Sequence, residues 1–281
     1  MYGCCLVAFA PKSTVSSNPG PLSNAWDFPP GSRPLPLIIA HRGDLSNAPE
    51  NTLPAFRSAY ESGADGIELD VRLTRDDQLV VFHDRGLRRI GGVRGLVSNT
   101  TLDEMRSLDA GEWFGPEFRG LRVPTLDEVF ELLPSGFLIN VEMKAVIDRM
   151  RLIAHRVAEA LRRHQRQAST LVSSFNPISL WELRRIDPSI TRGYIWSRRH
   201  PPPIRSRCFS RMVRAHWYDP AHDSYNPRLM RNMRRRNVRT LAWDVDFGRD
   251  LSRMVSARLD AVVTDDLDSI LKQRRKLDIL S

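Results

Sequence analysis

The segment GIELDV, residues 66–71, has the apolar character of a buried β-strand, yet it carries two carboxylates. Side chains alternate between the two faces of a strand, so Glu68 and Asp70 point the same way and their apolar neighbours point the other way. Two ionised carboxylates on one face repel each other, and burying them costs on the order of several kcal/mol per ion unless positive charge lies between them. Other parts of the chain must therefore supply positive charge at this point.

Strand-like and helix-like segments alternate along the rest of the chain. From Leu35 onward, short β-branched runs are each followed by an amphipathic segment, which is the pattern of βαβ units around a parallel sheet. The expected strands cover residues 35–40, 65–74 with an extension at 78–84, 136–144, 169–175, 190–196, 211–218, 238–246 and 260–265. Eight strand–helix units in a chain of this length predict an α/β fold of the (β/α)8 type, a TIM-type barrel.

Two regions fall outside this alternation. Residues 85–124 contain a capped helix at 100–108 and the aromatic loop GEWFGPEF at 111–118, and we expect a small insertion there, after the second strand. Residues 1–34 are rich in Pro, Ser and Asn, and we expect them to form a flexible N-terminal leader. The barrel domain is accordingly expected over residues 35–281.

Composition narrows the class of protein. Apolar residues make up 41% and charged residues 27% of the chain, which excludes a disordered or a membrane-embedded protein. The 42 basic residues exceed the 33 acidic ones, and nearly all the basic residues are Arg. Guanidinium groups favour anionic partners such as phosphate esters, lipid head groups or nucleic acid, although a GC-rich genome explains the Arg content equally well.

The cysteines indicate a reducing compartment. Cys4, Cys5 and Cys208 form neither a disulfide framework nor a Cys/His zinc pattern, so we expect a cytoplasmic protein. The first residues include a short apolar run without preceding basic residues or a clear cleavage site. Export by a cryptic N-terminal signal is the minority alternative.

Three carboxylates are expected to converge at one end of the barrel. In such barrels the active site lies at the C-terminal ends of the strands, where Glu68 and Asp70 of the second strand would meet Glu142 of the third. An oxygen-only set of ligands suits a hard divalent cation such as Mg²⁺ or Ca²⁺. The alternative is that arginines in the barrel mouth neutralise Glu68 and Asp70.

The same strand ends offer acid/base and cationic groups. Arg42 and Lys144 would place fixed positive charge beside the carboxylates, an arrangement that suits a phosphate group whose charge grows during transfer. His41 and His83 can divide the proton transfers, one deprotonating the nucleophile and the other protonating the leaving alkoxide.

Three motifs carry a specific resemblance. HRGDLSNAPENT (residues 41–52), GIELDVRLTRDDQLVVFHD (residues 66–84) and NVEMK (residues 140–144), in this order and spacing, resemble the glycerophosphodiester phosphodiesterase family. The resemblance extends from about Leu35 to Leu271. It implies a TIM-type barrel that uses a divalent cation to hydrolyse glycerophosphodiesters to an alcohol and glycerol 3-phosphate.

The resemblance also implies roles for individual residues. The implied metal ligands are Glu68, Asp70 and Glu142, for Mg²⁺ or Ca²⁺ and also for Mn²⁺; the acid/base pair is His41 and His83; the phosphate-binding residues are Arg42 and Lys144. In this family the 2-hydroxyl of the substrate is often discussed as the nucleophile, and the sequence does not choose between it and water.

The seventh strand departs from the family pattern. It contains WDVD, so that Asp246 stands where a neutral Asn is usual, a change that disfavours an anionic substrate or favours a cationic head group. Trp243, at the same strand end, is a candidate for packing on the glycerol or the head group, and core packing explains it equally well.

Two rival functions compete with this prediction. A related barrel enzyme acting on lysophospholipids or other membrane lipids would use the same residues, with Trp113, Phe114 and Phe118 as an apolar lid. A binding protein would use the basic runs MRNMRRRNVR and KQRRK, but these lie on expected helices that must pack on the barrel. We therefore expect a small-molecule phosphodiester as the partner, no nucleic acid, and at most transient contact with a membrane surface. The sequence does not predict the oligomeric state.

Overall fold

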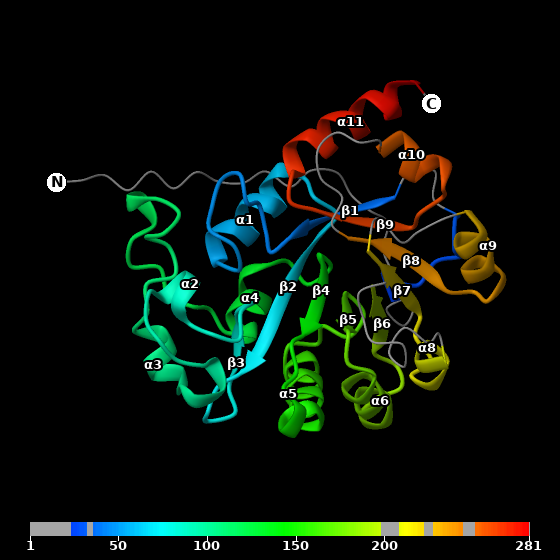
Figure 1. The fold of residues 1–281 in the computed structure, drawn as a ribbon. Coiled ribbons are helices and arrows are strands. Elements are labelled where there is room, and N and C mark those ends of the chain that lie inside the picture. The colour runs from blue at the N-terminus through cyan, green and yellow to red at the C-terminus, as the bar shows by residue number, and fades with distance from the viewer. Residues whose placement is uncertain (1–23, 33–35, 198–207, 222–226, 244–250, 281) are drawn as a thin grey trace.

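A closed barrel of eight parallel strands forms the centre of the molecule. The structure is a computed structural model of the 281-residue chain and describes residues 24–32, 36–197, 208–221, 227–243 and 251–280. The strands follow the order β1-β9-β8-β7-β6-β5-β4-β2, and pairing between β1 and β2 closes the sheet (Figure 1). The predicted TIM-type barrel is confirmed.

The strands and helices have the following bounds. The strands are β1 (Leu37–His41), β2 (Gly66–Leu73), β3 (Leu79–Val81), β4 (Leu138–Met143), β5 (Thr170–Ser174), β6 (Thr191–Trp196), β7 (Trp217–Pro220), β8 (Arg239–Ala242) and β9 (Ala261–Thr264). The helices are α1 (Leu53–Ser62), α2 (Arg88–Gly91), α3 (Leu102–Arg106), α4 (Leu126–Leu132), α5 (Met150–Arg163), α6 (Pro177–Ile186), α8 (Cys208–Met212), α9 (Pro227–Arg235), α10 (Leu251–Ser256) and α11 (Leu267–Leu280). Among the described residues no helix is both long enough and apolar enough to cross a membrane.

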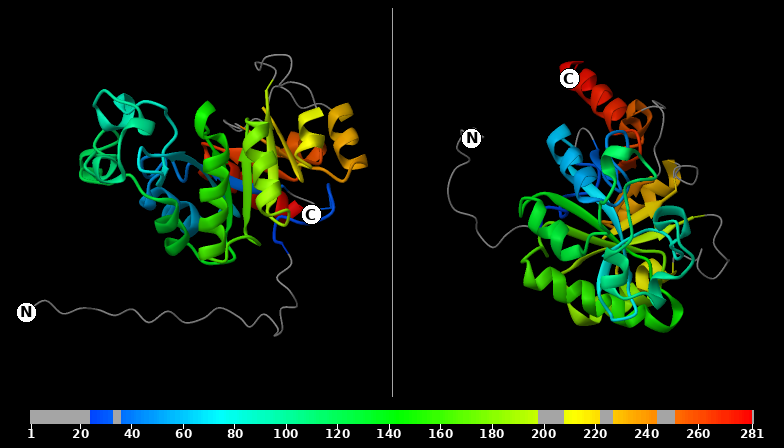
Figure 2. Two further views of the ribbon diagram at one scale, coloured as in Figure 1. Left: turned by 90° about the horizontal axis from the view of Figure 1, so that it is seen from below. Right: turned by 90° about the vertical axis from the view of Figure 1, so that its left-hand side faces the viewer.

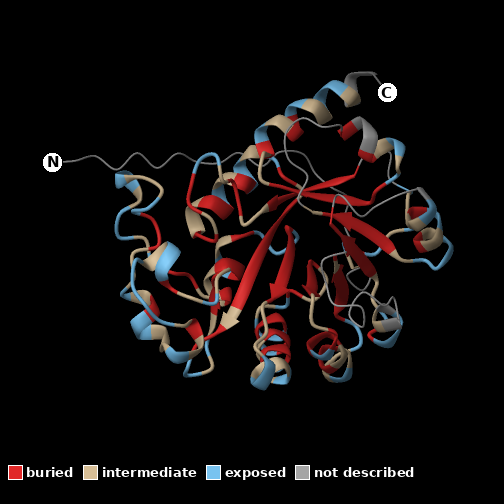
Figure 3. Cartoon of the chain, in the orientation of Figure 1, coloured by how far each residue is buried: buried red, intermediate tan, exposed pale blue. Residues whose placement is uncertain are grey.

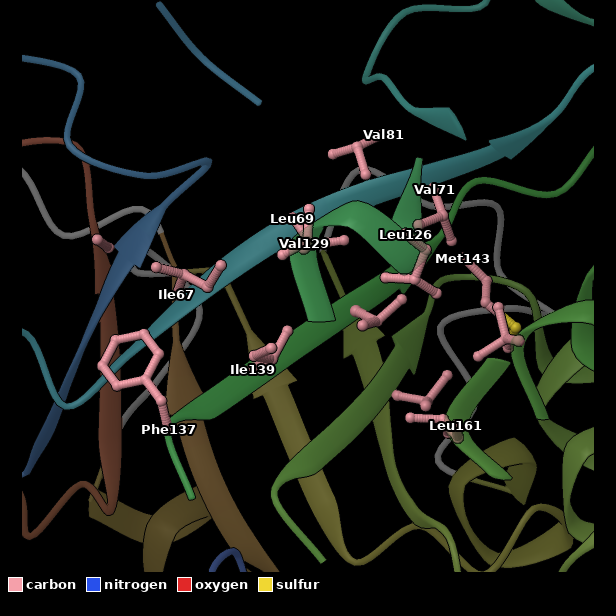
Figure 4. Close-up of a cluster of buried hydrophobic side chains, with 14 of the residues drawn as sticks. Ile67, Leu69, Val71, Val81, Leu126, Val129, Phe137, Ile139, Met143 and Leu161 are labelled. Atoms are coloured by element: carbon pink, nitrogen blue, oxygen red, sulfur yellow. The ribbon is translucent and has the colours of Figure 1, made fainter. Parts of the chain in front are cut away.

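Alternating side chains on the strands build two separate apolar layers. One face of each strand packs outward under the helices, as Ile67, Leu69 and Val71 do beside Val129 of α4 (Figure 4). The strands are buried almost throughout, whereas the helices expose their outer faces (Figure 3). The opposite face of each strand points into the barrel, so Glu68 and Asp70 lie inside it. The alternation in GIELDV therefore places the apolar side chains in the core under the helices and the two carboxylates inside the barrel.

Helix α1 shows how local signals place an element. The hydroxyl of Thr52 accepts a hydrogen bond from the backbone N–H of Ala55, Pro54 lies in the first turn, and Gly63 ends the helix with φ of 89°. These signals account for both ends of the helix, at Leu53 and Ser62.

The predicted sixth strand, residues 211–218, is placed too early. Arg211 and Met212 belong to α8, and the strand β7 begins at Trp217. Arg214 adopts a left-handed conformation with φ of 47°, which ends the helical turn before the strand starts. The β-branched and aromatic residues that suggested one strand are thus divided between a helix end and a later strand. Of the predicted seventh strand, residues 244–246 lie outside the described residues.

The insertion follows a hairpin on the outside of the barrel. Strand β3 pairs antiparallel with β2 and leads into α2, α3 and two short 3₁₀ segments, which lie to one side of the barrel (Figures 1 and 2). These elements share a small apolar core of their own, formed by Val80, Phe82, Leu87, Val97, Met105, Ala110 and Val123. The hairpin thus places an independently packed unit next to the C-terminal end of β2.

Residues 24–32, within the predicted leader, pack against the opposite end of the barrel. Trp26 is fully buried, its Nε1 donates to the carbonyl of Ser169 at 2.9 Å, and its ring meets the ring of Trp217 edge-on at 5.2 Å. Arg239 reaches from β8 to the side chain of Asp27 and the carbonyl of Phe28. This segment therefore closes the bottom of the barrel. Residues 1–23 lie outside the described residues.

Removing the Trp26 side chain should destabilise the fold without altering the chemistry. We expect Trp26→Ala to lower the free energy of unfolding by about 3–5 kcal/mol, because it leaves a large cavity and removes the buried hydrogen bond to Ser169. Urea denaturation followed by circular dichroism measures this change. Ile147→Ala, at a side chain that is 86% exposed, is the control and should change stability by less than about 0.5 kcal/mol. Equal effects of the two substitutions would show that the segment does not close the barrel.

Candidate active site

A cavity of about 210 Å³ opens among the C-terminal ends of the strands. It is lined by His41, Arg42, Glu68, His83, Asn140, Glu142, Lys144, Phe175, Ile195, Asp219, Leu241, Trp243 and Val263. One side of the cavity is charged and the other is apolar and aromatic. The structure thus brings seven of the eight predicted site residues to the cavity wall, and the eighth, Asp70, lies directly behind them.

Parallel pairing of β2 and β4 brings the three carboxylates together. Asp70 and Glu142 are register partners, and Glu68 lies two residues earlier on the same face of β2. Glu68, Asp70 and Glu142 each offer a ligand atom, and these atoms all lie within 4.8 Å of one another. All three residues are buried.

Two cationic side chains neutralise part of the negative charge of the three carboxylates. Lys144 Nζ lies 2.7 Å from Glu142 Oε1 and 3.1 Å from Asp70 Oδ1, and Arg42 Nε lies 3.3 Å from Asp70 Oδ2. Glu68 instead faces His41, whose Nε2 is 3.8 Å from Glu68 Oε2, and the backbone N–H of Arg42. Lys144 and Arg42 therefore lie closer to the other two carboxylates than to Glu68.

The carboxylates titrate differently as a result. Burial and the neighbouring charge of Asp70 raise the pKa of Glu68 to about 8. Burial also acts to raise the pKa of Asp70, but Lys144 and Arg42 outweigh it and hold that pKa well below its usual range. Burial raises the pKa of Glu142 in spite of Lys144. Without further positive charge, one of the three carboxylates keeps a proton at neutral pH.

The donor set fits a divalent cation. Asp70 Oδ1 and Glu142 Oε1 are buried and lack a hydrogen bond of good geometry, although Lys144 lies within ion-pair distance of both. The cluster offers three oxygen donors, and the raised pKa of Glu68 shows that its negative charge is not fully neutralised by the protein. Both features favour binding of a cation that prefers oxygen ligands.

A strained loop after β1 aims groups at this cluster. Arg42 and Asn51 both adopt the left-handed conformation, with φ of 56° in each, and such strain concentrates at functional sites. Gly43 has φ of 97°, and a Cβ there would lie 2.6 Å from the Cβ of Ala55, so no other residue fits. The result is that Asn51 Nδ2 donates to Asp70 Oδ2 at 2.9 Å.

His41 lies at the end of β1, between two carboxylates. Its Nδ1 is 2.5 Å from Asp265 Oδ1, and its Nε2 points toward Glu68. Asp265 follows β9, the neighbour of β1 in the barrel. The ring is therefore fixed in orientation, with Nε2 facing the cavity.

His83 reaches the cavity from the hairpin extension. Its Nδ1 is 2.8 Å from Asp84 Oδ1, and Asp84 is held by Arg89. Arg72 fixes the backbone by donating from Nε and Nη2 to the carbonyl of His83, at 2.8 and 2.6 Å. Burial, together with the positive charges of Lys144 and Arg42, lowers the pKa of His83.

Trp243 forms part of the apolar wall. Its Nε1 donates to the backbone carbonyl of Asp219 at 2.9 Å, and its ring meets Phe175 edge-on at 5.7 Å. Asp246, the other predicted feature of this strand end, lies outside the described residues. In the insertion, Trp113 and Phe118 both meet Phe114 edge-on.

Some residues of the site were not assigned from the sequence. Asn51 and Asp84 lie within the motifs at residues 41–52 and 66–84, but the sequence does not show which side chains they contact. Asp265 pairs with His41 across 224 residues of sequence, a contact that only barrel closure creates. Asp219 was missed because the predicted sixth strand ended before it.

Comparison with known proteins is consistent across sequence and structure. A model of the glycerophosphoryl diester phosphodiesterase family matches residues 41–269. A glycerophosphodiester phosphodiesterase of Caldanaerobacter subterraneus is 38% identical over 241 residues, which are 85% of this chain and 98% of that protein.

Solved structures give the same result. An Oleispira antarctica phosphodiesterase in complex with the product sn-glycerol-3-phosphate matches with a TM-score of 0.78 and 30% identity, covering 86% of this chain and 97% of that one. A glycerophosphodiester phosphodiesterase of Thermotoga maritima matches with a TM-score of 0.69 and 26% identity, covering 85% and 98% of the two chains.

Proposed function

Because this chain belongs to the glycerophosphoryl diester phosphodiesterase family and is a glycerophosphodiester phosphodiesterase, we propose that it releases glycerol 3-phosphate and an alcohol in a reaction that depends on a divalent cation. The observation that carries this proposal is the buried cluster of Glu68, Asp70 and Glu142, which lies beside two cations and two histidines. These three carboxylates would hold an oxygen-preferring cation such as Mg²⁺, Ca²⁺ or Mn²⁺, which would stabilise the negative charge on the phosphoryl oxygens.

The cationic side chains bind and orient the phosphodiester. Lys144 and the guanidinium of Arg42 line the same cavity as the carboxylate cluster, within reach of the negative charge that a phosphate brings. Asp70 forms ion pairs with both cationic side chains, Lys144 and Arg42, and so holds them in place. Glu50 also accepts a hydrogen bond from Arg42 Nη1 at 3.0 Å. These contacts fix the positive charges before substrate binds, so little reorganisation accompanies the reaction.

The two histidines divide the proton transfers. The lowered pKa of His83 keeps its ring neutral at physiological pH, which suits a base that takes the proton of the nucleophile. His41 faces Asp265, a carboxylate that stabilises an imidazolium, and this suits an acid that protonates the leaving alkoxide through Nε2. The nucleophile is either the 2-hydroxyl of the substrate or water, and both routes need the same pair.

Removal of divalent cations tests the proposal. After treatment with EDTA and dialysis, the protein should release less than about 1% of the glycerol 3-phosphate that it releases from glycerophosphocholine or glycerophosphoethanolamine with metal present. Adding Mg²⁺, Ca²⁺ or Mn²⁺ should restore turnover, as measured by coupled oxidation of glycerol 3-phosphate. Full activity of the EDTA-treated protein, at a metal content below one-hundredth of an equivalent, would refute the metal requirement.

A further inference from the structure

Three buried polar side chains in the barrel carry oxygen atoms that have no hydrogen-bond partner among the described residues. Both carboxylate oxygens of Asp219, Oδ1 of Asn140 and Oγ of Ser173 are shielded from solvent and accept or donate no hydrogen bond there. Asp219 is only 1% exposed and Asn140 only 3%. Buried polar atoms are nearly always paired, so three neighbouring exceptions indicate a missing ligand.

Strand register places these groups beside the carboxylate cluster, because Asn140 is the register partner of Glu68. Ser173 is the register partner of both Glu142 and Gly193, and Asp219 lies on the next strand beyond Gly193. A Cβ at Gly193 would lie 2.5 Å from Asp219 Oδ2 and 3.2 Å from the Cβ of Ser173. The absence of a side chain at Gly193 therefore makes room for the Asp219 carboxyl group.

These groups lie at the inner end of the cavity rather than at its mouth. Asn140 and Asp219 line the cavity, together with Leu241 and Val263. The layer beneath is apolar and is closed by Leu171, Trp217 and Trp26, all of which are fully buried. A ligand group that reaches the Asp219 carboxyl group has no passage beyond it.

We propose that Asp219, with Asn140, binds the C1 hydroxyl of the glycerol moiety and so excludes substrates that are acylated at C1. The proposal rests on the proposed function, because it needs the phosphate held by Arg42, Lys144 and the metal cluster. A hydroxyl pairs with a carboxyl group in either protonation state, since it both donates and accepts. In a 1-acyl lysophospholipid this oxygen carries an acyl chain, for which the closed floor offers no space.

The surrounding charges favour a hydroxyl over a cationic head group at this position. A quaternary ammonium would need free aromatic faces, but Lys144 Nζ already lies 5.8 Å from the centre of the Phe175 ring. The apolar side chains beside Asp219 suit the carbon atoms of glycerol.

A substrate–mutant cycle tests this role. The two substrates are glycerophosphocholine and its 1-deoxy analogue, 2-hydroxypropyl phosphocholine, which keeps the 2-hydroxyl. We expect Asp219→Ala to lower kcat/KM on glycerophosphocholine by about 10²-fold and to change kcat/KM on the 1-deoxy analogue by less than about 3-fold. Asp219→Asn, which keeps the shape and one acceptor, should show the same preference with a smaller loss. Thermal melting shows whether Asp219→Ala folds. If it does not, Asp219→Asn takes its place in the comparison of the two substrates.

The control and the competing outcomes are distinct. Asp260→Asn alters another buried Asp, which binds the backbone of Thr240 at 2.9 Å, and should change both substrates by the same factor. Equal losses on both substrates with Asp219→Ala, or no loss on either, would overturn the proposal. The proposal would also be overturned if the wild type hydrolysed soluble 1-butanoyl-glycerophosphocholine as fast as it hydrolyses glycerophosphocholine. A wild type that hydrolyses no glycerophosphodiester would instead refute the proposed function itself.

Discussion

His41→Ala should slow hydrolysis of glycerophosphocholine by about 10²–10⁴-fold, and most of this loss should vanish when the leaving group is 4-nitrophenol. An alkoxide leaves only if it is protonated, whereas 4-nitrophenolate is stable without a proton. The contact of His41 Nδ1 with Asp265 at 2.5 Å orients Nε2 for this transfer. The measurement is kcat/KM for glycerophosphocholine and for glycerol 3-(4-nitrophenyl) phosphate.

His83→Ala gives the opposite pattern on the same two substrates. A base that activates the nucleophile is needed whatever group leaves, so we expect a loss of about 10²–10⁴-fold on both. His155→Ala is the matched control, because this histidine lies on the exposed side of α5 beside Glu182 and should leave both rates unchanged. If His83→Ala, rather than His41→Ala, is rescued by 4-nitrophenol, the two roles are reversed.

Glu68→Gln should abolish catalysis and yet stabilise the metal-free protein. With one of the three proposed carboxylate ligands gone, we expect turnover to fall by about 10³-fold or more at any concentration of Mg²⁺ or Ca²⁺. The glutamine keeps the shape of the side chain but removes a charge that burial and Asp70 oppose. In EDTA at pH 8 the variant should therefore unfold at a higher temperature than the wild type.

The pH dependence of stability follows from the same residue. The ordinary pKa of a glutamate, 4.5, applies to the unfolded chain, and the pKa of Glu68 is raised to about 8 in the fold. Between these values the folded protein holds a proton that the unfolded chain has lost. The free energy of unfolding therefore falls as pH rises from 4.5 to 8, by about 1.4 kcal/mol per pH unit from this group. Asp70, with its pKa lowered, is ionised in both states across this window and contributes a constant amount.

The contrast with another buried glutamate makes this test specific. Glu182 on α6 contacts His155 and Arg185, outside the cavity, so Glu182→Gln should weaken the fold slightly and leave turnover intact. Melting curves of both variants and the wild type in EDTA, between pH 5 and 8, measure the slopes. An unchanged slope in Glu68→Gln would show that Glu68 does not carry the buried proton.

The sequence was sufficient to predict the barrel and most of the cavity wall, because period and motif are local signals. Alternation in GIELDV indicated which side chains enter the barrel, and paired carboxylates in an apolar strand indicated a charged site. The helix signals at Thr52 and Gly63 were equally local. Each of these features depends on residues only a few positions apart.

The remaining features depend on closure of the sheet or on backbone conformation. The pairing of His41 with Asp265 requires β1 and β9 to be neighbours, which follows only once the barrel closes. The boundary of β7 depends on the left-handed turn at Arg214, a conformation that Arg rarely signals. Packing of Trp26 at the barrel bottom joins residues more than 140 positions apart, so the composition of the first 34 residues gave no indication of it.

The two histidines belong to different structural units. His41 ends a strand of the barrel itself, whereas His83 follows strand β3 of the hairpin, in the connection that leads into the separately packed insertion. A change in the insertion, through loop exchange or drift in its small core, can therefore shift His83, the proposed base, while the proposed metal ligands stay in place. Chimeras that exchange residues 85–124 between relatives should change the rate of nucleophile activation and keep cation affinity, which makes this insertion the natural place to engineer that rate.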